Sequence, residues 1–394
     1  MVNRVSSTTP PRGRRRALVL ALGCLGLTPE VAHAAPPPPP AMAAAEPGLS
    51  HDVGTSAMDA PIARTSADLR FFAIGDFEAP SHVMMVYSPE WPKLMRELAR
   101  HITARAELVL LPEEGSDFDA LQYFRNHLPR TQQSKTTVIR HPVDSVWVRD
   151  YGPRTLQGPS GVRWVDAVYD SDDGRWRDDV APRALAKHFE VDYLPVTFEV
   201  DGGALISNGE GFCVMTEESW IELVGTTSVS GSHDRALVAV GCKEVLVVPP
   251  LLNEPTGHVD VFAQFTGPRR IMLASVKPTE SPEDAARIEQ TADFLSRWVA
   301  PDGGRLRIDR VPMPVLEDGE YYSYINGLQL EDRYVAPSFK EIGKSREAAA
   351  HAALERAMPR LDIVTVPGSS LRELEGVVHC ATLGFRLPED FIED

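Results

Sequence analysis

The sequence predicts an α/β fold for most of this 394-residue chain, and three observations support that prediction. From Arg70 onward, short runs rich in β-branched and apolar residues alternate with longer segments in which apolar residues recur every three or four positions. The composition, with 43% hydrophobic and 24% charged residues, is typical of a globular protein. No stretch inside this region has the composition of a second linker. We therefore expect one α/β domain over residues 69–394, built from several strand–helix–strand units.

The first 68 residues are predicted to lie outside this domain. A cluster of arginines precedes the apolar run ALVLALGCLGL, which leads to Ala32-His33-Ala34, a cleavage pattern of small residues. The run is shorter than the roughly 20 apolar residues of a membrane-spanning helix, so residues 1–34 are predicted to be a signal peptide. Residues 35–68, rich in Pro and Ala and then polar, are predicted to be a linker. We expect an exported protein, periplasmic or extracellular, with no stable membrane insertion after the signal is removed.

Strands and helices are expected to alternate along the domain. In order, strands are predicted at 82–88, 106–112, 135–142, 243–250, 260–266, 269–276, 305–313, 322–330, 333–339, 361–367 and 376–385. Helices are predicted at 89–102, 118–128, 282–300 and 345–358. The first of these helices shows the pattern clearly, because Leu94, Leu98 and Ile102 recur at intervals of four and form one apolar stripe.

Charge and cysteine content restrict the classes of partner. The net charge of −16 argues against nucleic acid or an anionic membrane as the main partner, and it is compatible with a cationic substrate. Cys24 would leave with the signal peptide, so the mature chain keeps Cys213, Cys242 and Cys380. An exported enzyme could pair two of these and keep one free. The sequence leaves open which two would pair.

Two polar segments interrupt the apolar pattern before the C-terminal region. In DSVWVRDYGPRT, a predicted strand ends in Arg149 and Asp150 before a Gly-Pro turn, which is typical of a pocket rim but equally of a structural ion pair. In PTGHVDVFAQF, His258 and Asp260 would lie on the same face of a strand. Such a pair could be an acid/base with its charge partner, half of a metal site, or a surface pair.

The third segment, GVVHCATLGF, places Cys380 directly after His379. A lone cysteine is most often a small buried hydrophobe. If the segment is a strand, the side chains of His379 and Cys380 point to opposite faces, so His379 is not expected to act as the base for Cys380. A metal site also fits poorly, because no C-x-x-C or H-E-x-x-H pattern occurs. His258 is the better candidate base, since a carboxylate is close to it.

Four motifs, VWVRDYGP, TGHVDVFAQF, YSYINGLQL and GVVHCATLGF, together resemble the bacterial (porphyromonas-type) peptidylarginine deiminase and agmatine deiminase family, from about Phe71 to Phe385. The resemblance implies a five-bladed, pseudo-symmetric α/β propeller, the pentein fold, without a metal or an organic cofactor. This chain departs from the family where Glu-Gly-Gly-Asn is usual, because it has Asp201, Gly202, Gly203 and Ala204 there.

The resemblance also implies roles for individual residues. Cys380 would be the nucleophile, His258 the acid/base, and Asp150 and Asp260 the carboxylates that bind a guanidinium group. Asn326 would support the active site, and Trp147 would form a wall of the substrate channel. The implied reaction is hydrolytic deimination, in which a guanidinium group becomes a ureido group and ammonia through a covalent Cys thiouronium intermediate.

The substrate is predicted from the segment YDSDDGRWRDD. Arg175 and Arg177 match the arginines that hold a C-terminal carboxylate in peptidylarginine deiminases, although the neighbouring aspartates could instead neutralise them in a solvated loop. We favour arginine-containing peptides or proteins, with a C-terminal arginine, over agmatine, whose deimination gives N-carbamoylputrescine. A cysteine amidohydrolase and an inactive binding homologue are the alternatives from other classes.

Overall fold

The computed structural model describes residues 62–64, 70–115, 118–169, 174–226, 233–316, 319–372 and 376–391. The predicted signal peptide and most of the predicted linker lie outside these residues. Residues Ala60–Asp394 form one structural unit, and the description below refers to that unit.

Five small sheets make up this unit, and each contains the same triplet of strands. The first strand of a triplet runs antiparallel to the second, and the second runs parallel to the third. The triplets are β6 (Arg154–Gly158), β7 (Gly161–Val168) and β8 (Asp192–Glu199); β9 (Leu205–Ser207), β10 (Phe212–Thr216) and β11 (Glu244–Val248); β12 (Ala263–Gly267), β13 (Arg270–Ser275) and β14 (Arg307–Pro312); β15 (Leu328–Gln329), β16 (Arg333–Ser338) and β17 (Asp362–Pro367); and β18 (Thr382–Phe385), β3 (His82–Tyr87) and β4 (Glu107–Pro112). This fivefold repetition confirms the predicted α/β propeller.

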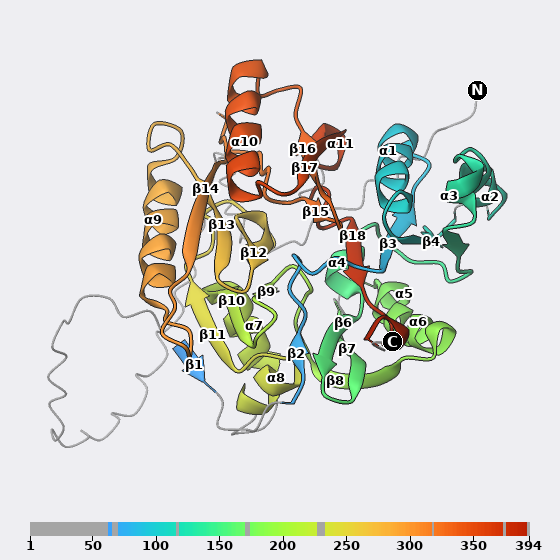
Figure 1. Cartoon of the computed structure of the whole chain (residues 1–394), viewed down its shortest axis with the longest axis horizontal. Coiled ribbons are helices and arrows are strands. Elements are labelled where there is room, and N and C mark those ends of the chain that lie inside the picture. The colour runs from blue at the N-terminus through green and yellow to red at the C-terminus, as the bar shows by residue number, and fades with distance from the viewer. Residues whose placement is uncertain are drawn as a thin grey trace, which may run out of the picture. The chain divides into compact units, whose positions relative to one another are not determined.

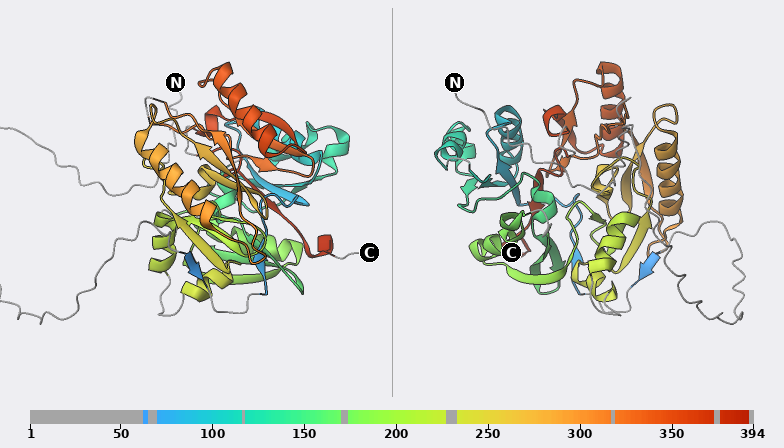
Figure 2. Two further views of the ribbon diagram at one scale, coloured as in Figure 1. Left: turned by 60° about the vertical axis from the view of Figure 1, so that its left-hand side comes forward. Right: turned by 180° about the vertical axis from the view of Figure 1, so that it is seen from behind.

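Helical segments connect the second and third strands of every triplet, and Figures 1 and 2 show the longer ones on the outer side of the sheets. They are α1 (Pro92–Thr103), α5 (Trp176–Asp179), α6 (Ala181–Phe189), α7 (Glu217–Thr226), α8 (His233–Ala239), α9 (Pro282–Arg297) and α10 (Lys344–Ala357). The remaining elements are β1 (Ile62–Arg64), β2 (Phe72–Ala73), β5 (Thr136–Val138), α2 (Phe118–Asn126), α3 (Arg130–Gln133), α4 (Val148–Tyr151), η1 (Val259–Val261), α11 (Ser369–Arg372) and η2 (Pro388–Phe391). Among the described residues, no helix has both the length and the apolar character needed to cross a membrane.

The C-terminal strand joins the last repeat to the first. β18 pairs with β3, with Thr382 opposite Met85 and Phe385 opposite His82, and Figure 1 shows the two strands side by side. The fifth triplet is therefore assembled from the two ends of the unit.

Local sequence accounts for the regular elements. The stripe of Leu94, Leu98 and Ile102 is buried on α1, as predicted. β3 and β4 are buried on both faces, as expected where parallel strands are covered from both sides. Ser281 caps α9, because its Oγ accepts a hydrogen bond from the Asp284 N–H while Pro282 occupies the first turn.

Several predicted strands begin too early, and the differences fall beside the first strands of the triplets. β12, β15 and β18 begin only at Ala263, Leu328 and Thr382, although strands were predicted from residues 260, 322 and 376. The segment with Arg149 and Asp150 is the short helix α4 and not a strand end. The alternation of apolar residues was misleading here. These residues are buried by neighbouring sheets, so their apolar side chains are covered in turns as well as in strands.

Two further details refine the predictions. Residues Ile62–Arg64, inside the predicted linker, form β1 and pair antiparallel with β11. Cys213 on β10 and Cys242, just before β11, form a disulfide, so Cys380 is the free and buried thiol. The pairing that the sequence left open is therefore the one within a single sheet.

Candidate active site

The five repeats contribute corresponding segments to one site, because each supplies residues just before its first strand. Asp150 lies on α4 before β6, and Asp201 precedes β9. His258 and Asp260 lie at and within η1, before β12. Asn326 and Cys380 precede β15 and β18, completing the set. Repeated strand triplets thus bring together residues that are far apart in the sequence.

Cys380 is a buried thiol fixed by Asn326. The Nδ2 of Asn326 donates to Cys380 Sγ at 3.1 Å, and the Oδ1 of Asn326 accepts hydrogen bonds from the backbone N–H groups of His379 and Cys380. Asp260 Oδ2 lies 3.9 Å from the same sulfur. Burial, followed by the charges of Asp260 and Asp150, raises the pKa of Cys380 well above its usual value. The site without substrate therefore holds a thiol and not a thiolate at neutral pH.

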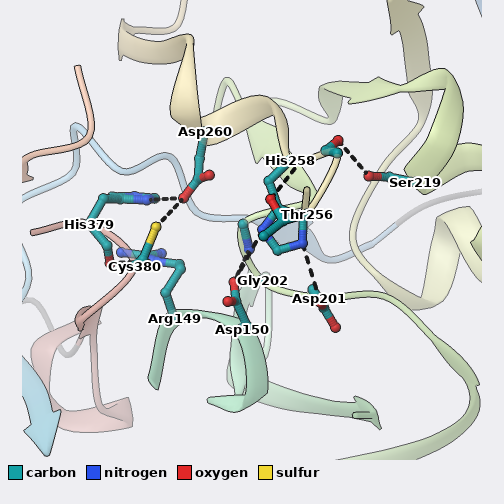
Figure 3. A network of polar contacts seen from close by, with 12 residues as sticks. Arg149, Asp150, Asp201, Gly202, Ser219, Thr256, His258, Asp260, His379 and Cys380 are labelled. Atoms are coloured by element: carbon teal, nitrogen blue, oxygen red, sulfur yellow. Dashed lines mark hydrogen bonds and ion pairs between the residues drawn. The ribbon is translucent and has the colours of Figure 1, made fainter. Parts of the chain in front are cut away.

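His258 is bound between two carboxylates, and we call Asp150, Asp201 and His258 the front cluster (Figure 3). His258 Nε2 lies 3.2 Å from Asp201 Oδ2, and Nδ1 lies 3.6 Å from Asp150 Oδ1. Burial lowers the pKa of His258, but Asp150 and Asp201 outweigh it and the pKa is raised. Burial also raises the pKa of Asp150, against the lowering by His258. His258 is therefore an imidazolium, able to give a proton to a leaving group.

The turn that carries His258 is fixed by Glu254. Its Oε2 accepts a hydrogen bond from the His258 N–H at 3.1 Å, and its Oε1 accepts from Thr256. Glu254 is itself buried. The imidazole is thus positioned through its backbone as well as through its ring.

Gly203 explains the glycine pair before β9. A Cβ at this position would come within 2.7 Å of His258 Nδ1, 2.9 Å of Asp150 Oδ1 and 3.0 Å of Asp260 Oδ2. The Gly203 N–H donates to Asp150 Oδ1, and its carbonyl accepts from the Asp260 N–H. Because glycine has no side chain, Asp150, Asp260 and His258 can all lie close to this backbone.

Only one of the two carboxylate oxygens of Asp260 has a hydrogen-bond partner among the described residues. Its Oδ2 is 2.6 Å from His379 Nδ1, whereas its Oδ1 is buried without a hydrogen-bond partner among the described residues. A buried, unsatisfied carboxylate oxygen is costly, so a donor is expected to occupy this position when the site is filled. A planar guanidinium offers several N–H donors and a positive charge, and it matches the paired carboxylates of Asp150 and Asp260.

A second set of charged residues lies on the other side of Asp260, and we call Asp76, Arg149 and His379 the rear cluster (Figure 3 shows Arg149 and His379). His379 Nε2 lies 3.3 Å from Asp76 Oδ1, which is 3.0 Å from Arg149 Nη1. The sequence did not predict this cluster, and the strand that was predicted to point His379 and Cys380 to opposite faces is absent. Because residues 378–380 form a turn and not a strand, His379 and Cys380 can both approach Asp260.

The predicted substrate-binding residues are placed differently from one another. Trp147 lies against the turn before the nucleophile, since a Cβ at Gly376 would be 2.4 Å from its ring. Arg177 pairs with Asp144 at 2.7 Å and with Glu114 at 3.2 Å, and its guanidinium lies over the Trp176 ring.

Arg175 is closer to the site in its contacts. Its Nη1 donates to Tyr169 Oη at 2.9 Å. Burial, followed by the charges of Asp150 and Asp201, raises the pKa of Tyr169 well above its usual value, which relates this tyrosine to the front cluster. The structure therefore brings Cys380, His258, Asp150, Asp260 and Asn326 together, and it separates Arg177 from them by ion pairs of its own.

A cavity of about 120 Å³ adjoins the thiol through Asn326. Its lining includes the carboxylates of Glu254 and Glu320, Tyr321, and the turn at Gly376 before Cys380. The described residues that line it include no lysine or arginine. Across the described part of the chain, no group of three or more His, Cys, Asp or Glu side chains is arranged to hold a metal ion.

Comparisons with known proteins agree with this geometry. Residues 79–385 match the model of the Porphyromonas-type peptidyl-arginine deiminase family. The chain is 27% identical over 281 residues to an agmatine deiminase of Stutzerimonas stutzeri, covering 62% of this chain and 75% of that protein. It is 26% identical over 357 residues to an agmatine deiminase of Pseudomonas putida F1, covering 79% of this chain and 94% of that protein.

Solved structures show the same fold. The agmatine deiminase of Enterococcus faecalis superposes with a TM-score of 0.68 at 19% identity, covering 82% of this chain and 98% of that one. The agmatine deiminase of C. jejuni gives a TM-score of 0.64 at 17% identity, covering 80% and 96%.

The chain belongs to the Porphyromonas-type peptidyl-arginine deiminase family, as the resemblance of its motifs implied. It is a hydrolase that acts on the C–N bond of a guanidino group. The family is named after peptidyl-arginine deiminases, whereas the curated relatives given above are agmatine deiminases. The identity of the guanidine substrate is therefore the remaining question.

Proposed function

We propose, from this family membership and the geometry of the site, that the protein deiminates a small guanidine with a cationic tail, of which agmatine is the simplest. The observation that carries the proposal is the cavity beside Asn326, whose charged lining groups are Glu254 and Glu320. A carboxylate-lined cavity favours an ammonium tail and repels a carboxylate. The curated agmatine deiminases to which the chain is similar support the same substrate class. This reverses the preference for peptidyl arginine based on the sequence alone.

The reaction follows from the charges around Cys380. A bound guanidinium offsets the negative charges of Asp150 and Asp260, so the Cys380 thiol can release its proton to solvent and become a thiolate. The thiolate then adds to the guanidinium carbon, and the neutral tetrahedral adduct expels ammonia with a proton from the His258 imidazolium. A thiouronium remains on Cys380. Neutral His258 next takes a proton from water, whose oxygen adds to the same carbon. The C–S bond then breaks as the hydroxyl proton of the adduct passes to the leaving sulfur, which gives the ureido product and the Cys380 thiol.

Two substrates that differ only in the tail test the proposal. Agmatine and n-butylguanidine share the reacting group and the four-carbon chain, but only agmatine carries an ammonium. We expect kcat/KM for agmatine to exceed that for butylguanidine by about tenfold or more, measured as ammonia and ureido product. Glu320→Gln should reduce this preference, while Cys380→Ala should abolish turnover of both. Equal kcat/KM values for the two guanidines would contradict the cationic-tail proposal.

A second candidate, peptides that end in arginine, rests on one contact. Arg175 donates to Tyr169, next to the front cluster, and could hold a terminal carboxylate there. The predicted partner Arg177 is less suited, because Asp144 and Glu114 already neutralise it. Rates on a peptide with a free C-terminal arginine and on its amide distinguish this candidate. A marked preference for the free carboxylate, lost in Arg175→Gln, would favour the peptide, and export of the protein would then be consistent with it.

A further inference from the structure

The rear cluster holds His379 rigidly next to Asp260. The His379 side chain is only 2% exposed, and its Nδ1 is 2.6 Å from Asp260 Oδ2. Its backbone N–H donates to Asn326 Oδ1 at 3.1 Å, so the residue is tied to the same asparagine that binds the nucleophile. Neither the proposed addition step nor the departure of ammonia uses this histidine.

The charges of the rear cluster favour a protonated His379. Burial and the nearby Arg149 guanidinium lower the pKa of His379, but Asp76 and Asp260 outweigh them and the pKa is raised. Arg149 and His379 overcome the effect of burial on Asp76 and hold its pKa well below the usual range. The imidazolium of His379 therefore lies between two carboxylates, with Arg149 as a permanent cation beside them.

A cavity of about 50 Å³ lies on the far side of His379 from the thiol. The lining includes the polar side chains of Asp76, Arg149, Arg154, Gln264, Gln329 and His379. This cavity and the cavity beside Asn326 share no described lining residue. His379 Nε2 makes no hydrogen bond of good geometry among the described residues, despite its 3.3 Å distance from Asp76. A polar space of this size suits a few ordered waters that complete the contact.

We propose that His379 is a positioning residue for the deimination: anchored by Asp76, it holds Oδ2 of Asp260 so that Oδ1 faces the guanidinium beside Cys380. The inference rests on the proposed function. Without His379, Asp260 would lose its 2.6 Å contact to Nδ1 and would be free to rotate. A carboxylate turned away would no longer bind the guanidinium through a charge-assisted hydrogen bond.

The groups that face this pair come from several elements. Asp260 is approached by Asp150, His258, Cys380, His379 and Tyr334, and His379 is approached by Asp76, Arg149 and Asp260. Of the described neighbours of Asp260 named above, only His258 and His379 can carry a positive charge. His258 lies closest to Asp150 and Asp201, so His379 provides the direct cationic contact to Asp260.

Three variants test the inference. His379→Gln keeps a hydrogen-bond donor for Asp260 but removes the positive charge. Asp76→Asn removes the carboxylate that anchors His379, and the side chain of Asp76 is 23% exposed. His82→Gln is the matched control, since His82 stacks on Phe385 away from both clusters. Each variant is measured for kcat, KM and the pH profile of kcat/KM with the best substrate, and for binding of the guanidinium ion by calorimetry.

We expect His379→Gln to raise KM and weaken guanidinium binding by roughly 10-fold to 100-fold, with a smaller loss in kcat. Asp76→Asn should move the same quantities in the same direction by less, and His82→Gln should move none of them.

Unchanged KM and unchanged guanidinium binding in both rear variants would overturn the inference. If His379→Gln does not fold, Asp76→Asn alone decides, with the same criteria. Failure of the proposed function is recognised separately, because the wild-type protein would then show no preference for agmatine over n-butylguanidine. Calorimetry with the guanidinium ion tests the role of His379 even in that case.

Discussion

The front and rear clusters share one arrangement of side chains but differ in the number of positive charges. Each is a buried histidine between two carboxylates: His258 between Asp150 and Asp201, and His379 between Asp260 and Asp76. The rear cluster also contains the permanent cation Arg149, and Arg154 lies close to it. The front cluster has no arginine in contact among the described pairs, and the nearby Asp260 has one oxygen without a hydrogen-bond partner among the described residues. The region short of positive charge is the one that can bind a cation.

Removal of the front histidine should have the largest effect on this comparison. We expect His258→Asn to lower kcat by about a thousandfold with little change in KM, because an acid/base acts on the transition state and not on binding. The rear variants, in contrast, should act mainly on KM. Steady-state kinetics with the best substrate measures both quantities. A similar split between kcat and KM for the two histidines would mean that the clusters do not have separate roles.

Gly203→Ala should disturb Asp260 together with the front cluster. The added methyl would meet His258, Asp150 and Asp260 at 2.7–3.0 Å, so these groups must move apart. Misplacement of this kind costs roughly a hundredfold in kcat/KM. Gly225→Ala is the matched control, since a Cβ at Gly225 on α7 meets nothing within 4 Å. Near-normal activity of Gly203→Ala would show that the spacing of the carboxylates is less strict than the contacts indicate.

The titration of Cys380 reports how strongly a bound cation offsets the negative charge around the thiol. Its pKa is raised by burial, Asp260 and Asp150, so the thiolate of the free protein should appear only at strongly alkaline pH. Bound guanidinium ion should bring the thiolate to lower pH, by about one unit or more, because the cation stabilises the anion. Thiolate absorbance, with Cys380→Ser as the blank, follows the change. No shift with guanidinium would mean that the cation does not bind between the carboxylates.

Loss of the disulfide should have the smallest effect on activity. Cys213 and Cys242 hold β10 to the segment before β11, in the sheet whose first strand follows Asp201 and Gly203. The double change Cys213→Ala and Cys242→Ala should lower the free energy of unfolding by about 2–4 kcal/mol. kcat/KM below the unfolding transition should stay within about twofold, since neither cysteine contacts the site. Urea unfolding and kinetics test both parts, and a large loss of activity in the folded variant would connect this sheet to the front cluster.

The sequence predicted many residues of the site but few of the hydrogen bonds and ion pairs between them. The motifs brought Asp150, His258, Asp260, Asn326 and Cys380 into one proposed site, and these five do lie together. The predicted local structure around these residues was wrong, because the alternation of apolar residues predicted strands where buried turns occur. The assignment of opposite faces to His379 and Cys380 depended on such a strand.

Charge pairs could not be predicted for a related reason. Arg149 and Asp150 are adjacent, and a structural ion pair between them was one interpretation of the sequence. In α4 they point to different clusters, Arg149 to Asp76 and Asp150 to His258. Both partners come from distant parts of the chain, so only the packing of the five sheets reveals them. Asp201, the one residue of the altered glycine motif with a charge, was noted only as a departure and proved to be the contact of His258 Nε2.

The pairing of β18 with β3 has a consequence for the timing of activity during synthesis. Ser81 and Phe385, which are in hydrogen-bond contact across this junction, are 304 positions apart. A ribosome makes β3 early, and that strand lacks its antiparallel neighbour until β18 emerges. The nucleophile lies two residues before β18, so it reaches the pre-arranged carboxylates in the same late step. Chains interrupted before Cys380 therefore lack both the closing strand and the nucleophile, and they cannot attack guanidines.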